Sequence, residues 1–274
     1  MKTRDAPIGV FDSGVGGLTV LKALVTQLPR ERFVYLGDTA RLPYGTKSPE
    51  TVVRYALQAG QALARYGVKC LVIACNTASA VGLAAVSERI RDVPVIGVIE
   101  PGAEAACLAS RSGHIAVIGT EGTVRGGAYQ DAIVRRRSDA RVSAVPAQLF
   151  VALAEEGLCR GPIAQGVARH YLEPLFNGRA AISRPDTLVL GCTHFPMLAD
   201  VICAAVGAEV GIVDSAATTA RCVRQTLESE NLLARVGEGG LRLLATDAAE
   251  RFARIGGRFL ERPIRPEEVE LIDL

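Results

Sequence analysis

The sequence lacks the features that mark several large classes of protein. It has no run of about 18 uninterrupted apolar residues, so we expect no segment to span a membrane. The N-terminus reaches Asp12 after only a handful of apolar positions, which is too short and too polar for a signal peptide. Its 31 basic and 29 acidic residues leave a net charge of +2. This overall charge gives no indication that the protein binds nucleic acid or a membrane surface.

The sequence also lacks the motifs that usually hold a metal ion or a cofactor. The seven cysteines are widely spread without CxxC spacing, which argues against a disulfide framework and a structural zinc site and predicts a reduced, cytoplasmic protein. Enzymes that use pyridoxal phosphate need a Schiff-base lysine, and none of the four lysines lies in a matched motif at the end of a predicted strand. We therefore expect neither a cofactor nor a metal ion.

Short apolar runs alternate with helical patterns along the chain, which is typical of parallel α/β sheets. With 49% hydrophobic residues over 274 positions, the chain can bury the cores of two ordinary domains. We expect strands at residues 8–11, 33–36, 71–74, 95–99, 115–119, 142–145, 188–190, 210–213 and 241–245. The expected helices include residues 49–66, 78–86, 149–156, 163–176 and 248–260.

Two offsets suggest that the chain contains one structural plan twice. The strand at residue 8 is followed 107 residues later by the strand at residue 115, and Cys75 is followed 117 residues later by Cys192. We predict a discontinuous first domain, residues 1–99 plus 211–274, and a second domain, residues 100–210. The predicted fold class is α/β, with two similar doubly wound parallel-sheet domains related by pseudo-twofold symmetry and an active site in the cleft between them.

Cys75 and Cys192 each end an apolar run where a parallel strand is expected to meet a helix. Open α/β sheets bind ligands at this edge. A free thiol has a pKa of about 8.5, and a helix N-terminus lowers it, so we expect a lowered pKa at both cysteines. Hydrogen-bonding residues that suit a carboxylate follow each thiol directly: Asn76 and Thr77 after the first, Thr193 and His194 after the second.

Two matched thiols on opposite sides of a cleft suit a reaction whose substrate and product are mirror images. One group removes the proton from the stereocentre, and the other returns a proton to the opposite face. A redox dithiol usually has CxxC spacing, which is absent here. A hydrolase that uses one cysteine with His194 would leave the repeated Cys75 motif unexplained.

A glycine-rich turn at residues 14–17 lies between the first strand and a helix. Thr19 stands where a dinucleotide fingerprint has its third glycine, and the GK[ST] of a P-loop is absent. Backbone N–H groups in such a turn can approach an anion. Because Asp12 and Ser13 lie at its mouth, we interpret the turn as part of the functional site.

Five motifs, in the same order along the chain, resemble those of the glutamate racemases. This family of the aspartate/glutamate racemase superfamily makes D-glutamate for peptidoglycan without a cofactor. The motifs are Phe11-Asp12-Ser13-Gly14-Val15-Gly16-Gly17, Pro43-Tyr44-Gly45, Ala74-Cys75-Asn76-Thr77, Ile99-Glu100-Pro101-Gly102 and Gly191-Cys192-Thr193-His194.

The resemblance implies that Cys75 and Cys192 are the two bases, with Cys75 acting on the D-enantiomer and Cys192 on the L-enantiomer. Asp12 would assist Cys75, while His194 and Glu155 would assist Cys192.

The family's assisting glutamate residue is matched to Glu155, and the adjacent Glu156 is the alternative. The matching substrate-binding positions are Asp12, Ser13, Tyr44, Gly45, Asn76, Thr77, Thr193 and His194. The short N-terminus lacks the extension of some allosterically activated members, so that form of regulation is not expected.

Two alternatives accompany this hypothesis. The first is a racemase of aspartate or another small amino acid, although aspartate racemases usually carry a methionine-containing glycine turn in place of Asp12-Ser13-Gly14. The second is a regulatory binding protein that uses the basic cluster Arg135–Arg137, which we interpret as a solvated helix end because Asp139 lies beside it. We expect glutamate as the small-molecule partner and neither nucleic acid nor membrane, and a homodimer is compatible with the sequence.

Overall fold

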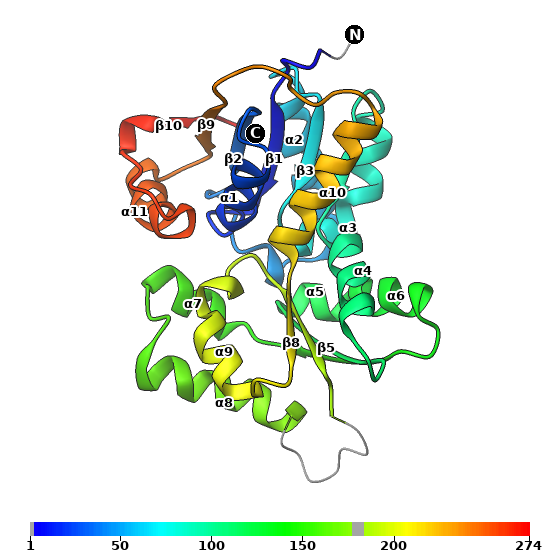
Figure 1. Cartoon of the computed structure of the whole chain (residues 1–274). Helices are drawn as coiled ribbons and strands as arrows, with labels where there is room; N and C mark the ends of the chain where they lie inside the picture. Colours follow the sequence, from blue (N-terminus) through cyan, green and yellow to red (C-terminus); the bar gives the residue numbers. More distant parts are fainter. Residues whose placement is uncertain (1–2, 177–183) are drawn as a thin grey trace.

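The computed structural model describes residues 3–176 and 184–274, in which ten strands form two parallel sheets (Figure 1). The first sheet has the order β10-β9-β2-β1-β3-β4 and contains β1 (Ile8–Asp12), β2 (Arg32–Gly37), β3 (Cys70–Ile73), β4 (Val95–Gly97), β9 (Gly240–Ala245) and β10 (Val269–Leu271). The second has the order β6-β5-β7-β8 and contains β5 (His114–Gly119), β6 (Arg141–Pro146), β7 (Thr187–Gly191) and β8 (Gly211–Asp214). The predicted class, α/β with two parallel sheets, is confirmed.

Helices connect the strands and cover the sheets. The α-helices are α1 (Leu18–Gln27), α2 (Pro49–Ala64), α3 (Asn76–Arg89), α4 (Ile99–Ala109), α5 (Glu121–Arg125), α6 (Ala128–Arg136), α7 (Leu149–Glu156), α8 (Gly161–Phe176), α9 (Ala199–Val206), α10 (Ser215–Ser229) and α11 (Ala249–Leu260). Three short 3₁₀ helices are η1 (Tyr44–Thr46), η2 (Phe195–Leu198) and η3 (Pro266–Glu268). In the first unit α1 packs against α10 and α11, whereas α2 packs against α3.

The two sheets repeat one strand order, as the sequence offsets predict. The order β2-β1-β3-β4 in the first sheet corresponds to β6-β5-β7-β8 in the second. In the first sheet β2 pairs on one side of β1 and β3 pairs on the other. In the second sheet β6 and β7 flank β5 in the same way. Right-handed crossovers then place the connecting helices on opposite faces of the sheet. This reversal creates a switch point at the carboxyl edge, between β1 and β3 and again between β5 and β7.

The chain crosses between the two units twice (Figure 1). It enters the second unit at α4 and returns through β8 and α10. β8 pairs with β7 over residues 211–214, which were predicted to lie in the first domain. We therefore propose a first domain of residues 1–99 plus 215–274 and a second of residues 100–214, the latter including residues 177–183 outside the described part.

One predicted strand is shorter than the sequence suggested. Residues 95–99 were expected to form a strand, but β4 ends at Gly97 and Ile99 begins α4. The motif Ile99-Glu100-Pro101-Gly102 therefore forms the first turn of a helix. Proline is tolerated there because the first N–H groups of a helix have no intrahelical partner.

The two units share a hydrophobic core. One cluster of buried side chains contains Val10 and Tyr35 from the first sheet together with Ile118, Leu190 and Phe195 from the second unit. Burial of these side chains stabilises the junction between the two sheets as well as each sheet, which holds the two carboxyl edges together.

A buried ion pair ties together the end of the first sheet remote from this junction. Lys69 Nζ lies 2.5 Å from Glu31 Oε2, with side-chain exposures of 0% and 2%. The ammonium also donates to the carbonyl of Leu232 at 2.9 Å, and Glu31 Oε1 accepts from the backbone N–H of Ala234 at 2.8 Å. The pair therefore connects the loop after α10 to the sheet.

We expect Lys69→Met to destabilise the protein by about 3–5 kcal/mol, because it leaves the Glu31 carboxylate buried without a cation. Urea unfolding monitored by circular dichroism measures the loss. The control is Lys22→Met, which breaks the exposed Lys22–Glu261 pair and should cost about 0–1 kcal/mol. Equal losses in the two variants would show that the buried pair contributes no more than a surface pair.

Candidate active site

The switch points of the two sheets open onto one cavity. Asp12 ends β1 and Cys75 lies two residues after β3, while Thr120 follows β5 and Cys192 follows β7. From the first unit the cavity is lined by Ser13, Gly14, Leu42, Pro43, Tyr44, Gly45, Cys75, Asn76 and Thr77. From the second it is lined by Thr120, Gln148, Val151, Glu155, Cys192, Thr193 and His194. The structure thus brings every predicted site residue to this cavity except Asp12, which is fully buried beside it.

Cys75 is the N-cap of α3 and is almost completely buried. Its sulfur lies 3.4 Å from Ser13 Oγ. Burial and the nearby Asp12 charge raise the pKa of the Cys75 thiol to about 12, although hydrogen bonds from Ser13 and the Ala78 backbone act in the opposite direction. The predicted lowering of this pKa is therefore wrong, because loss of solvation outweighs the helix N-terminus.

Cys192 has different surroundings. No α-helix begins directly after it: the chain forms η2 from Phe195, and α9 begins only at Ala199. The expected match between two strand-to-helix corners is therefore wrong on this side. Tight turns replace the helix, with the N–H of Phe195 bonded to the Cys192 carbonyl at 3.2 Å. The thiol is hydrogen-bonded to His194, whose Nδ1 lies 3.7 Å from the sulfur.

His194 connects Cys192 to a carboxylate. Its Nε2 lies 3.3 Å from Glu155 Oε1. Burial alone would lower the pKa of His194, but hydrogen bonds to Cys192 and Glu155 raise it to about 10. The hydrogen bond to His194 lowers the pKa of Glu155 despite the burial of that carboxyl group. Glu156 is exposed, so the geometry selects Glu155 of the two adjacent glutamates.

Asp12 lies beneath the cavity with 0% exposure. Its Oδ2 accepts the backbone N–H of Gly14 at 2.9 Å, whereas its Oδ1 has no partner within the described residues. Burial raises the pKa of Asp12, and the His194 charge and nearby backbone N–H groups oppose this rise. The carboxyl group is therefore placed to influence the protonation of both Cys75 and His194.

The glycine-rich turn brings the two units into close contact. A Cβ atom on Gly16 would lie 2.4 Å from the His194 ring and from Thr193 Oγ1, so only glycine fits there. Thr19 Oγ1 also donates to the Thr193 carbonyl at 3.0 Å. The N–H of Gly14 donates to the Asp12 carboxylate. The turn is thus part of the site through packing, and anion binding by its other N–H groups stays a prediction.

Asn76 presents an unused hydrogen-bond donor. Its Oδ1 accepts from the hydroxyl of Tyr129 at 2.8 Å, which orients the amide. Its Nδ2 is buried and has no partner among the described residues. Buried donors are nearly always paired, so this one calls for a partner such as a ligand carboxylate.

Sequence reasoning missed several residues that line or support the cavity, among them Thr120 and Asp38. Thr120 Oγ1 lies 2.9 Å from Thr77 Oγ1 and joins the two units. Asp38 accepts hydrogen bonds from the Tyr44 hydroxyl and from Thr246 Oγ1, the latter at 3.0 Å, and so holds the Tyr44 loop in place. Thr120 directly follows a predicted strand and Asp38 lies two residues after one, and these positions were the signal available in the sequence.

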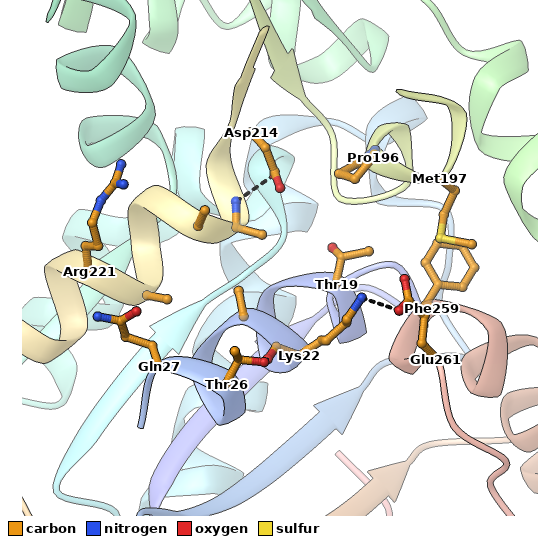
Figure 2. Close-up of a pocket in the computed structure, with 14 residues that line it drawn as sticks. Thr19, Lys22, Thr26, Gln27, Pro196, Met197, Asp214, Arg221, Phe259 and Glu261 are labelled. Atoms are coloured by element: carbon orange, nitrogen blue, oxygen red, sulfur yellow. Dashed lines mark hydrogen bonds and ion pairs between the residues drawn. The ribbon is translucent and has the colours of Figure 1, made fainter. Parts of the chain in front are cut away.

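A roomier cavity of about 350 Å³ lies between α1 and α10 (Figure 2). Its lining includes the Lys22–Glu261 ion pair at 2.5 Å and Asp214, which caps α10 by accepting the N–H of Ala216 at 2.8 Å. Neither cysteine lines it. We therefore assign the chemistry to the cavity at the switch points, where thiols, an imidazole and a carboxylate converge.

The arginines of the basic cluster at the end of α6 each pair with an acidic residue of the same chain. Arg135 and Arg136 both pair with Glu100, Arg135 at 2.5 Å. Arg137 pairs with Asp139 at 3.4 Å and donates to the Ser110 carbonyl at 2.7 Å. This arrangement disfavours the alternative of a regulatory protein that binds its partner through these arginines.

The described residues contain neither a membrane-spanning helix nor a cluster of metal ligands. No helix among residues 3–176 and 184–274 is long and apolar enough to cross a membrane. The same part of the chain contains no group of three or more His, Cys, Asp or Glu side chains placed to hold a metal ion.

The chain is similar to known proteins over segments that include strands of both sheets. A model of the family described as Asp/Glu/Hydantoin racemase matches residues 8–223. The chain is 50% identical over 254 residues to a glutamate racemase of Geobacter metallireducens, with 92% of each chain covered. The crystal structure of glutamate racemase from Francisella tularensis in complex with D-glutamate matches with a TM-score of 0.90 and 34% identity, covering 98% of both chains. The Thermus thermophilus glutamate racemase, in complex with β-chloro-D-alanine, matches with a TM-score of 0.88 and 45% identity, covering 100% of this chain and 99% of that one.

Proposed function

The chain belongs to the Asp/Glu/Hydantoin racemase family and racemises glutamate, and we propose that it does so by proton transfer between Cys75 and Cys192 without a cofactor. The observation that carries this mechanism is the position of the two thiols. Each follows the third strand of its own sheet, and both line one cavity. A single-base enzyme would not require a thiol at both switch points.

The proposed reaction begins with L-glutamate in the cavity. Cys192, as a thiolate, takes the α-proton from one face, and Cys75, as a thiol, donates its proton to the opposite face of the carbanion. The pKa of about 12 keeps the Cys75 proton in place until the carbanion forms. The product is D-glutamate, with Cys192 protonated and Cys75 a thiolate. The reverse reaction starts from that state.

The neighbours of the thiols have matching roles in this proposal. With its pKa raised to about 10, His194 is an imidazolium near neutral pH and donates hydrogen bonds to Cys192 and Glu155. Asp12 assists proton transfer at Cys75. The N-terminus of α3 and the unpaired Nδ2 of Asn76 supply donors for a substrate carboxylate. Ser13, Tyr44, Gly45, Thr77 and Thr193 complete the proposed binding surface.

The proposed setting is the cytoplasm, where the D-glutamate would supply peptidoglycan, as in the family that the sequence resembles. The proposed mechanism needs Cys75 and Cys192 as free thiols, which a reducing compartment preserves. A homodimer remains a hypothesis. Racemisation of aspartate is the remaining alternative. Measuring α-proton exchange on glutamate and aspartate in parallel distinguishes the two substrates.

Circular dichroism should show that purified protein converts L-glutamate to a racemic mixture, with the signal decaying to zero without any added cofactor. Chelator-treated protein should retain this activity. Exchange of the α-proton in deuterated water, measured on glutamate and aspartate in parallel, should be faster for glutamate. Activity that appears only after addition of pyridoxal phosphate, flavin or metal would contradict the mechanism, and faster exchange on aspartate would reverse the substrate assignment.

A further inference from the structure

Two arginines of α11 reach across the junction to the glutamate of the active site. α11 lies between β9 and β10 of the first unit, whereas Glu155 is in α7 of the second (Figure 1). Arg251 Nη2 lies 2.7 Å from Glu155 Oε2. Arg258 Nη1 lies 3.1 Å from the backbone carbonyl of Glu155. The two arginines are seven residues apart, two turns of helix, and so lie on the same side of α11.

Arg258 and Arg251 bind different parts of the same residue. The Glu155 carbonyl is in the last turn of α7, where carbonyl groups lack intrahelical partners and a cation is favourable. Gly157 ends this helix with φ of +76°, and a Cβ atom there would lie 2.7 Å from Arg258 Nη1. Arg258 therefore anchors the end of α7, and Arg251 acts on the Glu155 side chain.

Both oxygens of the Glu155 carboxylate are consequently engaged. Oε1 faces His194 at 3.3 Å and Oε2 faces Arg251 at 2.7 Å. The Glu155 side chain is 16% exposed, so water competes weakly for either oxygen. A carboxylate held at one oxygen only could rotate about its last side-chain bond, whereas one held at both keeps a single orientation.

We propose that Arg251 is a positioning residue for the Cys192 side of the reaction. By holding Oε2 of Glu155, it keeps Oε1 on His194 and thereby keeps the imidazole against the Cys192 sulfur. This inference rests on the proposed function, in which Cys192 acts on the L-enantiomer. It also makes the active site depend on the contact between α11 and α7, and so on the two units being closed on each other.

On the Cys75 side the charge that acts on Asp12 is that of His194, and among the described residues no arginine pairs there as Arg251 pairs with Glu155. The Cys75 thiol faces Ser13, and among the described residues no ion pair to Asp12 is found. Loss of Arg251 should therefore affect one face of the substrate more than the other. Net racemisation cannot reveal this difference, because the enantiomers have equal free energies and kcat/KM must fall by the same factor in both directions. A reaction that needs only one deprotonation can reveal it.

The experiment compares Arg251→Gln and Arg251→Lys with Arg254→Gln in the full chain. Arg254 is exposed on the same helix, and no ion pair to it is found in the described part of the chain, so its loss removes the same charge without touching Glu155. We expect Arg251→Gln to lower kcat for glutamate racemisation by about tenfold, because small misplacements of catalytic groups have effects of up to ~10²-fold. Arg251→Lys should recover most of the activity, and Arg254→Gln should match the wild type.

Two further measurements separate positioning from general damage. With β-chloro analogues of glutamate, Arg251→Gln should slow chloride release from the L-form at least fivefold more than from the D-form. In a Glu155→Gln background, Arg251→Gln should have no further effect on kcat, because its partner carboxylate is gone. Equal slowing of both analogues, an undiminished effect in that background, or wild-type activity in Arg251→Gln would each overturn the inference. Failure of the wild type to racemise glutamate would instead overturn the proposed function on which it rests.

Discussion

Replacement of either Cys75 or Cys192 by serine should abolish net racemisation of glutamate, because a complete turnover uses both thiols. Serine is nearly isosteric with cysteine, and both positions are almost completely buried, so the cavity should keep its shape. A serine hydroxyl is a much weaker acid than a thiol and cannot readily form the anion that removes the α-proton. The loss is measured by circular dichroism with either enantiomer as substrate.

The surviving thiol should still begin the reaction from its own face. With a β-chloro analogue, removal of the α-proton expels chloride from the β-carbon, so one deprotonation suffices. The variant Cys75→Ser should therefore release chloride from the L-analogue and not from the D-analogue, and Cys192→Ser should do the reverse. Cys203→Ser is the matched control, because this cysteine is exposed and does not line the cavity.

Two outcomes would contradict independent faces. Loss of both eliminations in both variants would indicate a single-base mechanism or a structural role for one cysteine. Retention of net racemisation in either variant would show that the proton at that face comes from another group. Chloride release with the two faces exchanged would preserve the two-base mechanism but reverse the assignment of Cys192 to the L-enantiomer.

Substitution of Asp12 by asparagine should lower kcat by about 10²–10⁴-fold with little change in KM, which is the usual range for loss of an acid/base group. Asp12 is fully buried beside the cavity without lining it, so it should contribute little to substrate binding. The asparagine side-chain oxygen can still accept the N–H of Gly14, whereas the amide cannot act as a general acid or base. Steady-state kinetics with each enantiomer measures both constants.

The chain supplies a control for this variant in a second Asp-Ser pair at the end of a strand. Asp214 ends β8 and precedes Ser215, much as Asp12 ends β1 and precedes Ser13, but it caps α10 and lines the separate cavity between α1 and α10. Asparagine is also a good N-cap, so Asp214→Asn should leave kcat near the wild-type value. Turnover of Asp12→Asn within threefold of the wild type would identify Asp12 as a structural residue of the turn.

Local signals in the sequence were enough to predict nine of the ten strands that the structure describes, β10 being the exception, and the two thiols that line the cavity. Buried parallel strands require continuous apolar runs, so the strands before Cys75 and Cys192 were visible without any knowledge of their partners. The repeated spacing then predicted the shared strand order. Ligands bind at the carboxyl ends of parallel strands, so the same reasoning located the residues that follow β1, β3 and β7.

The environment of each residue was decided by contacts that are distant in the sequence. Burial of Cys75 by the surrounding elements raises the pKa that its helix position alone would lower. Arg251 and Glu155 are 96 residues apart, and Asp38 and Thr246 are 208 apart, yet each pair is hydrogen-bonded. Strand and helix patterns reflect interactions over a few residues, whereas solvation and charge depend on everything packed around a group. The sequence by itself therefore determined most of the strands and the two thiols at their carboxyl ends, and only the tertiary structure determined the full lining of the cavity and the protonation and partners of its groups.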